Sequence, residues 1–206
     1  MKVLSCFVRT LLSASALLGI ASGATILNSS FEQPVTSGFV YDPIDPTGGW
    51  TFSGRSGVAA NTFFSPPPPN GSQAGFIQQF VDQPTALSSI SQSVTGVSLV
   101  PSILTFFIAQ RPGFAADPIV VAYGSQNLGT FTPASTSFAT VTINFTPTAT
   151  SGTLTFHSAA TTTGDLDTAI DSVAFNSVGT VVPEPSSTLL VLSALGLLAL
   201  VRRRSN

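Results

Sequence analysis

The sequence predicts an all-β domain, a β-sandwich of the jelly-roll type, between two terminal targeting segments. The middle of the chain is rich in Thr, Ser, Gly, Pro, Phe and Val and poor in charged residues. Such side chains favour pleated sheets over helices, because β-branched and aromatic groups fit a half-buried strand surface. About eight short apolar or alternating segments, separated by turn residues, are typical of a sandwich.

The predicted strands follow one another closely along the chain. Val141, Ile143 and Phe145 alternate with polar residues, which indicates a strand with one buried face. Segment 104–110 is almost continuously apolar and is expected to be a central strand covered on both faces. Gly124-Ser125 is expected to join two strands as a hairpin. The full set of predicted strands is 75–80, 88–94, 104–110, 118–123, 126–131, 138–145, 152–158 and 168–175.

Segment 31–69 differs from the rest of the middle. It is rich in Pro, Gly and aromatic residues and shows little alternation. We expect it to form a long surface excursion, with a short polyproline II segment at 66–69 because proline fixes φ.

Residues 1–24 have the pattern of a secretory signal peptide. Lys2 and Arg9 precede the apolar run 11–20, and Ser22 and Ala24 stand at the −3 and −1 positions. The alternative, a membrane anchor, is disfavoured because the apolar run is short. We expect cleavage after Ala24, which leaves a domain at 25–181.

Residues 182–206 form a second targeting segment. Pro183, Glu184 and Pro185 precede an apolar stretch at 188–201, which is followed by Arg202, Arg203 and Arg204. As a helix this stretch spans roughly 21 Å, less than the hydrocarbon core of about 30 Å, so it is marginal as a permanent anchor. The arginines favour the cytoplasmic side, which places the domain outside.

This three-part end resembles the PEP-CTERM sorting signal of Gram-negative bacteria. The resemblance implies a transmembrane helix at 188–201 that anchors the protein transiently in the inner membrane. It implies an exosortase as partner, a membrane enzyme that processes the tail near the motif. It also implies an exported cell-surface or extracellular-matrix protein of a bacterium that makes exopolysaccharide or biofilm. An ordinary single-span tail is the alternative.

Five different short motifs follow one another along the domain. They are 28–32 (Asn-Ser-Ser-Phe-Glu), 49–50 (Gly-Trp), 90–94, 104–106 and 170–173. Together they resemble galactose-binding-like jelly rolls, which include several carbohydrate-binding modules. In that family an acid after the early Phe and an acid in the last strand commonly hold a structural calcium ion. Glu32 and Asp171 occupy the matching positions, and Asp165 and Asp167 are further candidates. The alternatives are surface acids or acids capped by backbone N–H groups.

Trp50, Tyr41 and Arg111 are the candidate ligand-binding residues. Sugar sites stack aromatic rings on the apolar faces of pyranoses and add a few polar anchors. Tyr41 and Trp50 lie in the irregular region, as do Phe63 and Phe64, and Arg111 lies in a Pro-Gly loop. For Trp50 the alternative is a buried core position.

Composition argues against several other functions. Arg55 and Arg111 are the only basic residues between the ends, too few to bind nucleic acid. The single cysteine, Cys6, lies in the leader, and the single histidine, His157, has no triad partners placed by motif. We therefore expect no catalytic residues, although a paired-carboxylate glycosidase stays open. The expected function is non-catalytic polysaccharide binding; the alternative is a structural surface or matrix protein without a specific ligand.

Overall fold

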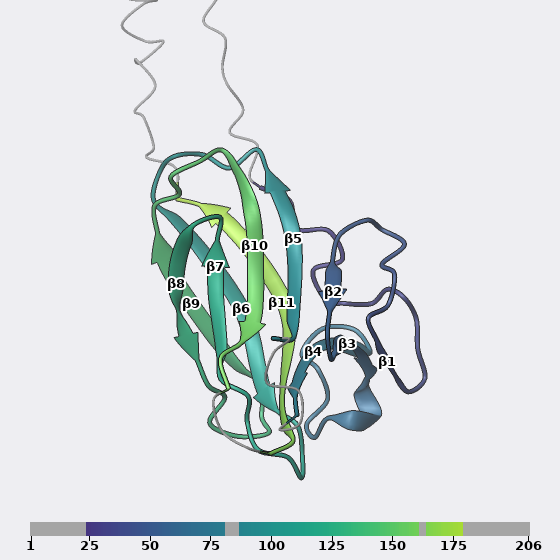
Figure 1. Ribbon diagram of the computed structural model, residues 1–206. Helices are drawn as coiled ribbons and strands as arrows, with labels where there is room; N and C mark the ends of the chain where they lie inside the picture. Colours follow the sequence, from purple (N-terminus) through teal and green to yellow (C-terminus); the bar gives the residue numbers. More distant parts are fainter. Residues whose placement is uncertain (1–23, 81–86, 161–163, 179–206) are drawn as a thin grey trace, which may run out of the picture.

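The computed structural model describes residues 24–80, 87–160 and 164–178, which form two antiparallel sheets packed face to face (Figure 1). One sheet has the strand order β1-β3-β4-β11-β6-β9 and the other β2-β5-β10-β7-β8. Strand β11, late in the sequence, lies between β4 and β6. This topology confirms the all-β, jelly-roll prediction.

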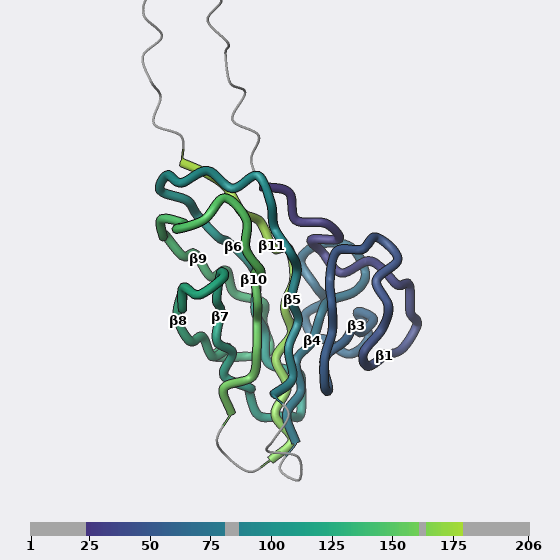
Figure 2. The backbone as a smooth tube through the Cα atoms, turned by 45° about the horizontal axis from the view of Figure 1, so that its top comes forward, coloured from purple at the N-terminus to yellow at the C-terminus, as the bar shows by residue number. Residues whose placement is uncertain are grey.

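The six-stranded sheet consists of β1 (Phe39–Tyr41), β3 (Ser56–Ala60), β4 (Gln73–Gln79), β11 (Leu166–Ser177), β6 (Ser102–Gln110) and β9 (Ala139–Phe145). The five-stranded sheet consists of β2 (Thr51–Ser53), β5 (Ser89–Thr95), β10 (Ser151–Ser158), β7 (Ile119–Tyr123) and β8 (Gln126–Phe131). A short 3-10 helix, η1 (Asn61–Phe63), follows β3. The tube view shows β1 and β3 at one side of the sandwich (Figure 2).

All eight predicted strands are confirmed, each with ends within a few residues of those expected. The hairpin is confirmed as well, since β7 and β8 pair from Ile119 with Phe131 to Tyr123 with Gln126. Gly124 at the turn has φ 56, a left-handed conformation that glycine adopts without strain.

Two expectations about the strands are wrong. Segment 31–69 contains β1, β2 and β3 rather than a surface excursion, and all of β3 is buried. Strands of three to five residues are too short to show a clear alternation, which explains the error. In β6 buried residues such as Leu104 and Phe106 alternate with half-buried ones as far as Ile108, so the outer face is half-exposed except at Ala109, which is buried.

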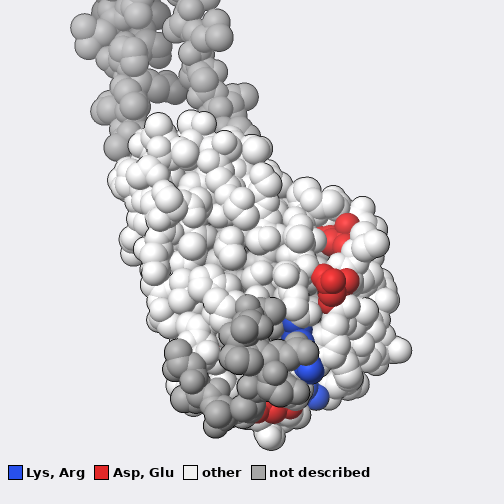
Figure 3. All heavy atoms as spheres, viewed as in Figure 1, with Lys and Arg blue, Asp and Glu red and all other residues white. Residues whose placement is uncertain are grey.

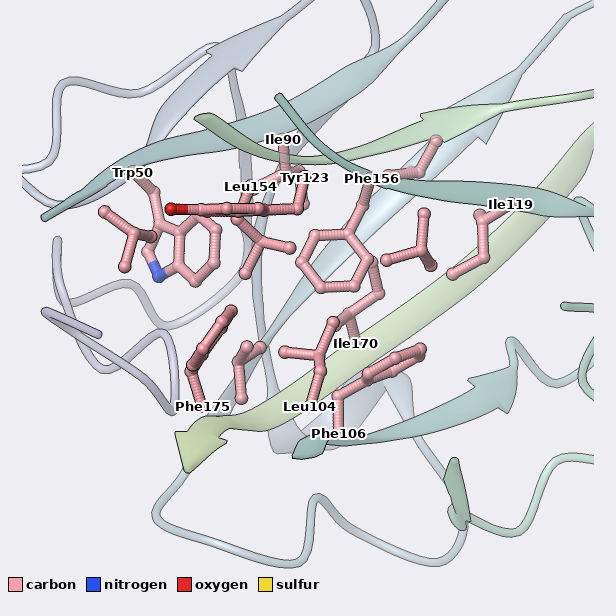
Figure 4. Packing of buried hydrophobic residues seen from close by; sticks show 14 of the residues in the cluster. Trp50, Ile90, Leu104, Phe106, Ile119, Tyr123, Leu154, Phe156, Ile170 and Phe175 are labelled. Atoms are coloured by element: carbon pink, nitrogen blue, oxygen red, sulfur yellow. The ribbon is translucent and has the colours of Figure 1, made fainter. Parts of the chain in front are cut away.

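The main core lies between the sheets and is rich in aromatic residues (Figure 4). Phe106 and Phe156, from opposite sheets, meet edge to face with ring centroids 5.1 Å apart. In β11 the pairing register shifts between Asp171 and Ala174. Such a bulge inserts an extra residue, and it allows Val173 to point into the core as Ile170 does.

The terminal predictions fall outside the described residues. They are the signal peptide, apart from Ala24 at its end, and the whole segment 182–206 with its helix and arginines. Among the described residues no helix is long and apolar enough to cross a membrane.

Candidate functional site

The outer face of the six-stranded sheet carries a second apolar cluster. One row of paired residues crosses five strands, from Tyr41 through Gly57, Phe76 and Ala169 to Ala109. Gly57 is required there, because a Cβ atom would lie 1.8 Å from the carbonyl oxygen of Val40. Small side chains form the floor of this face: Ala59, Ala74, Ala109 and Ala169.

Aromatic rings stand over this floor and form a shallow pocket. The Phe39 ring meets Tyr41 with centroids 5.4 Å apart and Phe63 with centroids 5.3 Å apart, both edge to face. Tyr41 also meets Phe76 at 5.3 Å. The Phe39 side chain is 49% exposed, so its ring is available to solvent. The pocket is lined by Phe39, Tyr41, Ala59, Phe63, Phe64, Phe76, Arg111 and Asp167.

Arg111 and Asp167 provide the charged groups of the pocket. Arg111 Nη1 donates to Asp167 Oδ2 over 3.3 Å, and the guanidinium lies above the Phe114 ring at 4.1 Å and the Phe63 ring at 5.3 Å. Asp167 is 2% exposed, and its other oxygen, Oδ1, is buried without a hydrogen-bond partner. Burial raises the pKa of Asp167 to about 7, although the Arg111 charge opposes this.

A partly buried chain of hydrogen bonds holds Tyr41 in place. The Tyr41 hydroxyl donates to Gln78 Oε1, and Gln78 Nε2 donates to Asp165 Oδ1 over 2.6 Å. Gln78 pairs with Asp167 across β4 and β11, so the chain lies beside the ion pair. Burial, assisted by the nearby Asp167 charge, raises the pKa of Tyr41, which therefore stays protonated at neutral pH.

The structure brings together two of the three predicted ligand residues, since Tyr41 and Arg111 both line the pocket. Trp50 does not join them, and its prediction as a ligand contact is wrong. It is 3% exposed, stacks on Phe31 at 5.0 Å, and its indole Nε1 donates to Asn28 O over 2.9 Å. Its side chain therefore belongs to the core, the alternative that the sequence left open.

Phe39, Phe76 and Asp167 are pocket residues that the sequence did not identify as ligand contacts. Phe76 stands beside Ile77 in an apolar run, and Ile77 belongs to the inner core. Because side chains alternate along β4, Phe76 then lies on the outer face. From the sequence alone, either Phe76 or Ile77 could point into the core. For Asp167 the sequence predicts only a possible contribution to the calcium site.

Glu32 and Asp171 both contact the loop before β4. Glu32 accepts hydrogen bonds from Ser72 N at 2.9 Å, Ser72 Oγ at 3.0 Å and Gln73 N at 3.0 Å. Asp171 accepts from Asn70 N at 3.1 Å and from its neighbour Ser172 N at 2.6 Å. Burial raises the pKa of Asp171 to about 7; these N–H donors oppose the shift and the Glu32 charge adds to it.

In this structure hydrogen-bond donors of the protein hold both acids. Calcium takes six to eight oxygen ligands, yet every carboxylate oxygen of Glu32 and Asp171 accepts a hydrogen bond from an N–H or O–H group. No group of three or more His, Cys, Asp or Glu residues suited to a metal occurs in the described part of the chain. The geometry matches the alternative of acids capped by backbone N–H groups. Calcium binding stays a prediction for measurement.

Comparison with known proteins identifies the C-terminal segment. Residues 181–205 match the PEP-CTERM protein-sorting motif, as the pattern at Pro183, Glu184 and Pro185 predicted. This motif indicates an exported surface protein that is processed by an exosortase. No curated protein matches the chain in sequence.

Several solved structures are similar to this chain at low sequence identity, and the two adhesin domains share its fold. The K1 cleaved adhesin domain of Lys-gingipain from Porphyromonas gingivalis is 13% identical with a TM-score of 0.52, covering 73% of this chain and 96% of that domain. The K2 cleaved adhesin domain of Lys-gingipain is 11% identical with a TM-score of 0.51, covering 73% and 97%. A xylan-binding domain from Paenibacillus barcinonensis is 12% identical with a TM-score of 0.47, covering 69% and 93%.

Proposed function

We propose that this exported, exosortase-sorted surface protein binds a polysaccharide of the cell surface or biofilm through the aromatic pocket, without catalysing a reaction. The observation that carries the proposal is the pocket itself, in which the half-exposed ring of Phe39 and the partly buried rings of Tyr41 and Phe63 lie beside Arg111 and Asp167. Apolar ring faces with a few polar anchors are the usual means of holding a pyranose.

The charge of the surface supports a neutral or weakly charged ligand. The domain between the ends has only two basic residues, Arg55 and Arg111. Charged atoms are also few on the opposite face of the sandwich, that of the five-stranded sheet (Figure 3). Without a basic patch, a strongly anionic polymer has little to bind. Ring stacking and hydrogen bonds are therefore the interactions that this surface offers.

The acids near the pocket support a non-catalytic role. Glycosidases use two carboxyl groups that flank the scissile bond, one as a general acid and the other as a base or nucleophile. Here Asp167 is paired with Arg111, and Asp165 accepts a hydrogen bond from Gln78. His157 Nδ1 lies 2.9 Å from the carbonyl oxygen of Ser158 and contacts no acid through this nitrogen.

The sorting signal supports the proposed location. Before processing, the apolar stretch 188–201 anchors the protein in the inner membrane of a Gram-negative bacterium, with the sandwich on the outer side. Exosortase processing then leaves the sandwich at the cell surface or in the matrix. In this setting a domain that binds polysaccharide attaches the protein to the surrounding polymer.

Affinity electrophoresis of the protein, purified in detergent, against a panel of bacterial and plant polysaccharides tests the proposal. We expect at least one polymer to retard the wild type and the variant Leu99→Ala, an exposed apolar residue that does not line the pocket. Tyr41→Ala should migrate as it does without polymer. If no polymer retards the wild type, the structural alternative, a matrix protein without a specific ligand, is favoured instead.

A further inference from the structure

We propose that the pocket recognises an uncharged sugar residue through two adjacent hydroxyl groups. One hydroxyl donates a hydrogen bond to Asp167, and the other accepts one from Arg111. This inference rests on the proposed polysaccharide binding and specifies the chemistry that the pocket selects. It follows from the hydrogen-bonding capacity that these two side chains leave unused, and from the charges around them.

Asp167 supplies a hydrogen-bond acceptor that the protein does not use. Asp167 lines the pocket, and its Oδ2 accepts from Arg111, whereas its Oδ1 is buried with no partner. The side chain is 2% exposed, so bulk water has little access to it. Buried acceptors are nearly always satisfied, and a ligand that donates a hydrogen bond at this point would complete the site.

Arg111 supplies donors next to that acceptor. A guanidinium has five N–H groups in one plane, and the structure uses one of them, on Nη1, for Asp167. The rings of Phe63 and Phe114 hold the guanidinium in place, and the Arg111 side chain remains 23% exposed. An acceptor beside a fixed donor matches two neighbouring hydroxyls, because each hydroxyl both donates and accepts.

The surrounding charges favour a neutral ligand over a charged one. An anionic sugar would face the carboxylates of Asp165 and Asp167, which both lie close enough to act on Tyr41. A cationic amino sugar would face Arg111 and Arg55, which act on Tyr41 in the opposite sense. Because burial raises the pKa of Asp167 to about 7, its carboxyl exists in both forms near neutral pH. A hydroxyl can bond to either form.

The test compares chemically matched polymers by affinity electrophoresis on the wild-type protein. The probes are neutral glucans, galactans and xylans, a polyuronate, a deacetylated amino-sugar polymer, and the best neutral polymer after periodate oxidation, which cleaves the bond between adjacent hydroxyl-bearing carbons. We expect a neutral polymer to bind most tightly and its oxidised form to bind at least tenfold more weakly. Tighter binding of a charged polymer, or equal binding of the oxidised polymer, overturns the inference and leaves polysaccharide binding intact. Binding of none overturns the proposed function as well.

Variants assign the effect to the two side chains. Asp167→Ala removes both side-chain acceptors, and Arg111→Lys keeps the charge but removes the planar donors. Each should weaken binding of the neutral polymer at least tenfold, whereas Leu99→Ala should not. Wild-type affinity in both variants overturns the assignment. Should one variant fail to fold in a melting experiment, the other variant and the periodate comparison decide the question.

Discussion

Two aromatic clusters lie on opposite faces of the six-stranded sheet and have different uses. The inner cluster, with Trp50, Phe31 and Phe106, lies between the two sheets and excludes water (Figure 4). The outer cluster, with Tyr41 and Phe76, lies on small floor residues and is left partly open. Aromatic content alone therefore does not distinguish a core from a binding surface in this protein.

The polar atoms of the two clusters differ. In the inner cluster the indole N–H of Trp50 has its own backbone acceptor, and the Tyr123 hydroxyl donates to Ala149 O over 3.4 Å. In the outer cluster Asp167 Oδ1 is buried without a partner. Asp117 Oδ2, between the sheets, is also buried without a partner, so an unused acceptor alone does not identify a binding surface. In the outer cluster this acceptor belongs to a pocket residue, and the neighbouring Phe39 ring is half-exposed.

The largest expected effect is the loss of stability in Trp50→Ala. Removing a buried tryptophan from a core costs about 3–5 kcal/mol, and the indole also stacks on Phe31 and contacts Phe156. Urea unfolding followed by circular dichroism measures the change in the free energy of unfolding. If Trp50→Ala kept normal stability but lost polysaccharide binding, Trp50 would act in binding. The assignment of the inner cluster to the core and of the outer cluster to binding would then be contradicted.

A second prediction uses an acid buried between the sheets. Asp117 is fully buried, accepts from Ser158 Oγ over 2.8 Å, and its N–H donates to Thr168 Oγ1 over 3.1 Å. Burial raises the pKa of Asp117 to about 7, while the Ser158 hydrogen bond opposes the shift. The folded protein therefore holds this proton more tightly than the unfolded chain. Stability should be highest below about pH 4 and fall as the pH rises through about 7.

Melting temperatures between pH 4.5 and 8 test this prediction. A shift of one pKa unit corresponds to about 1.4 kcal/mol, so the Asp117 contribution is at most about 4 kcal/mol. Asp167 and Asp171, whose pKa values are also raised to about 7, act in the same direction. Asp117→Asn should flatten the profile in part, whereas Asp42→Asn, which changes an acid with no role in either cluster, should leave it unchanged. A melting temperature that rises from pH 5 to pH 8 would show that these acids are charged at low pH.

Much of the fold was predictable because strand signals are local. The alternation around Val141 and the turn at Gly124 lie within a few residues of sequence. The pocket was less predictable, because its members come from five separate segments that only the sheet register brings together. Trp50 shows the limit most clearly: its acceptor, Asn28 O, lies 22 positions away, so no local pattern shows that the indole is satisfied.

The third prediction concerns the loop that Glu32 caps. Glu32 accepts three hydrogen bonds from Ser72 and Gln73, and Gly71 beside it leaves no room for a side chain, since a Cβ atom would lie 2.2 Å from Glu32 Oε1. Removing the acceptor in Glu32→Ala should lower stability by about 1–3 kcal/mol. Excess chelator should leave the melting temperature of the wild type unchanged. A rise of several degrees on adding calcium would instead support the calcium site predicted at Glu32 and Asp171.

The smallest effect on stability is expected at the outer cluster, in Phe39→Ala. This ring is 49% exposed and lies on an edge strand of three residues, so its loss should change the free energy of unfolding by less than about 1 kcal/mol. Its effect on binding should be much larger, because stacking on an exposed ring is an interaction that only the ligand completes. Urea unfolding and affinity electrophoresis on the same preparation separate the two quantities. If Phe39→Ala binds normally but unfolds easily, the outer cluster acts as a second core. The two faces of the six-stranded sheet would then not differ in function.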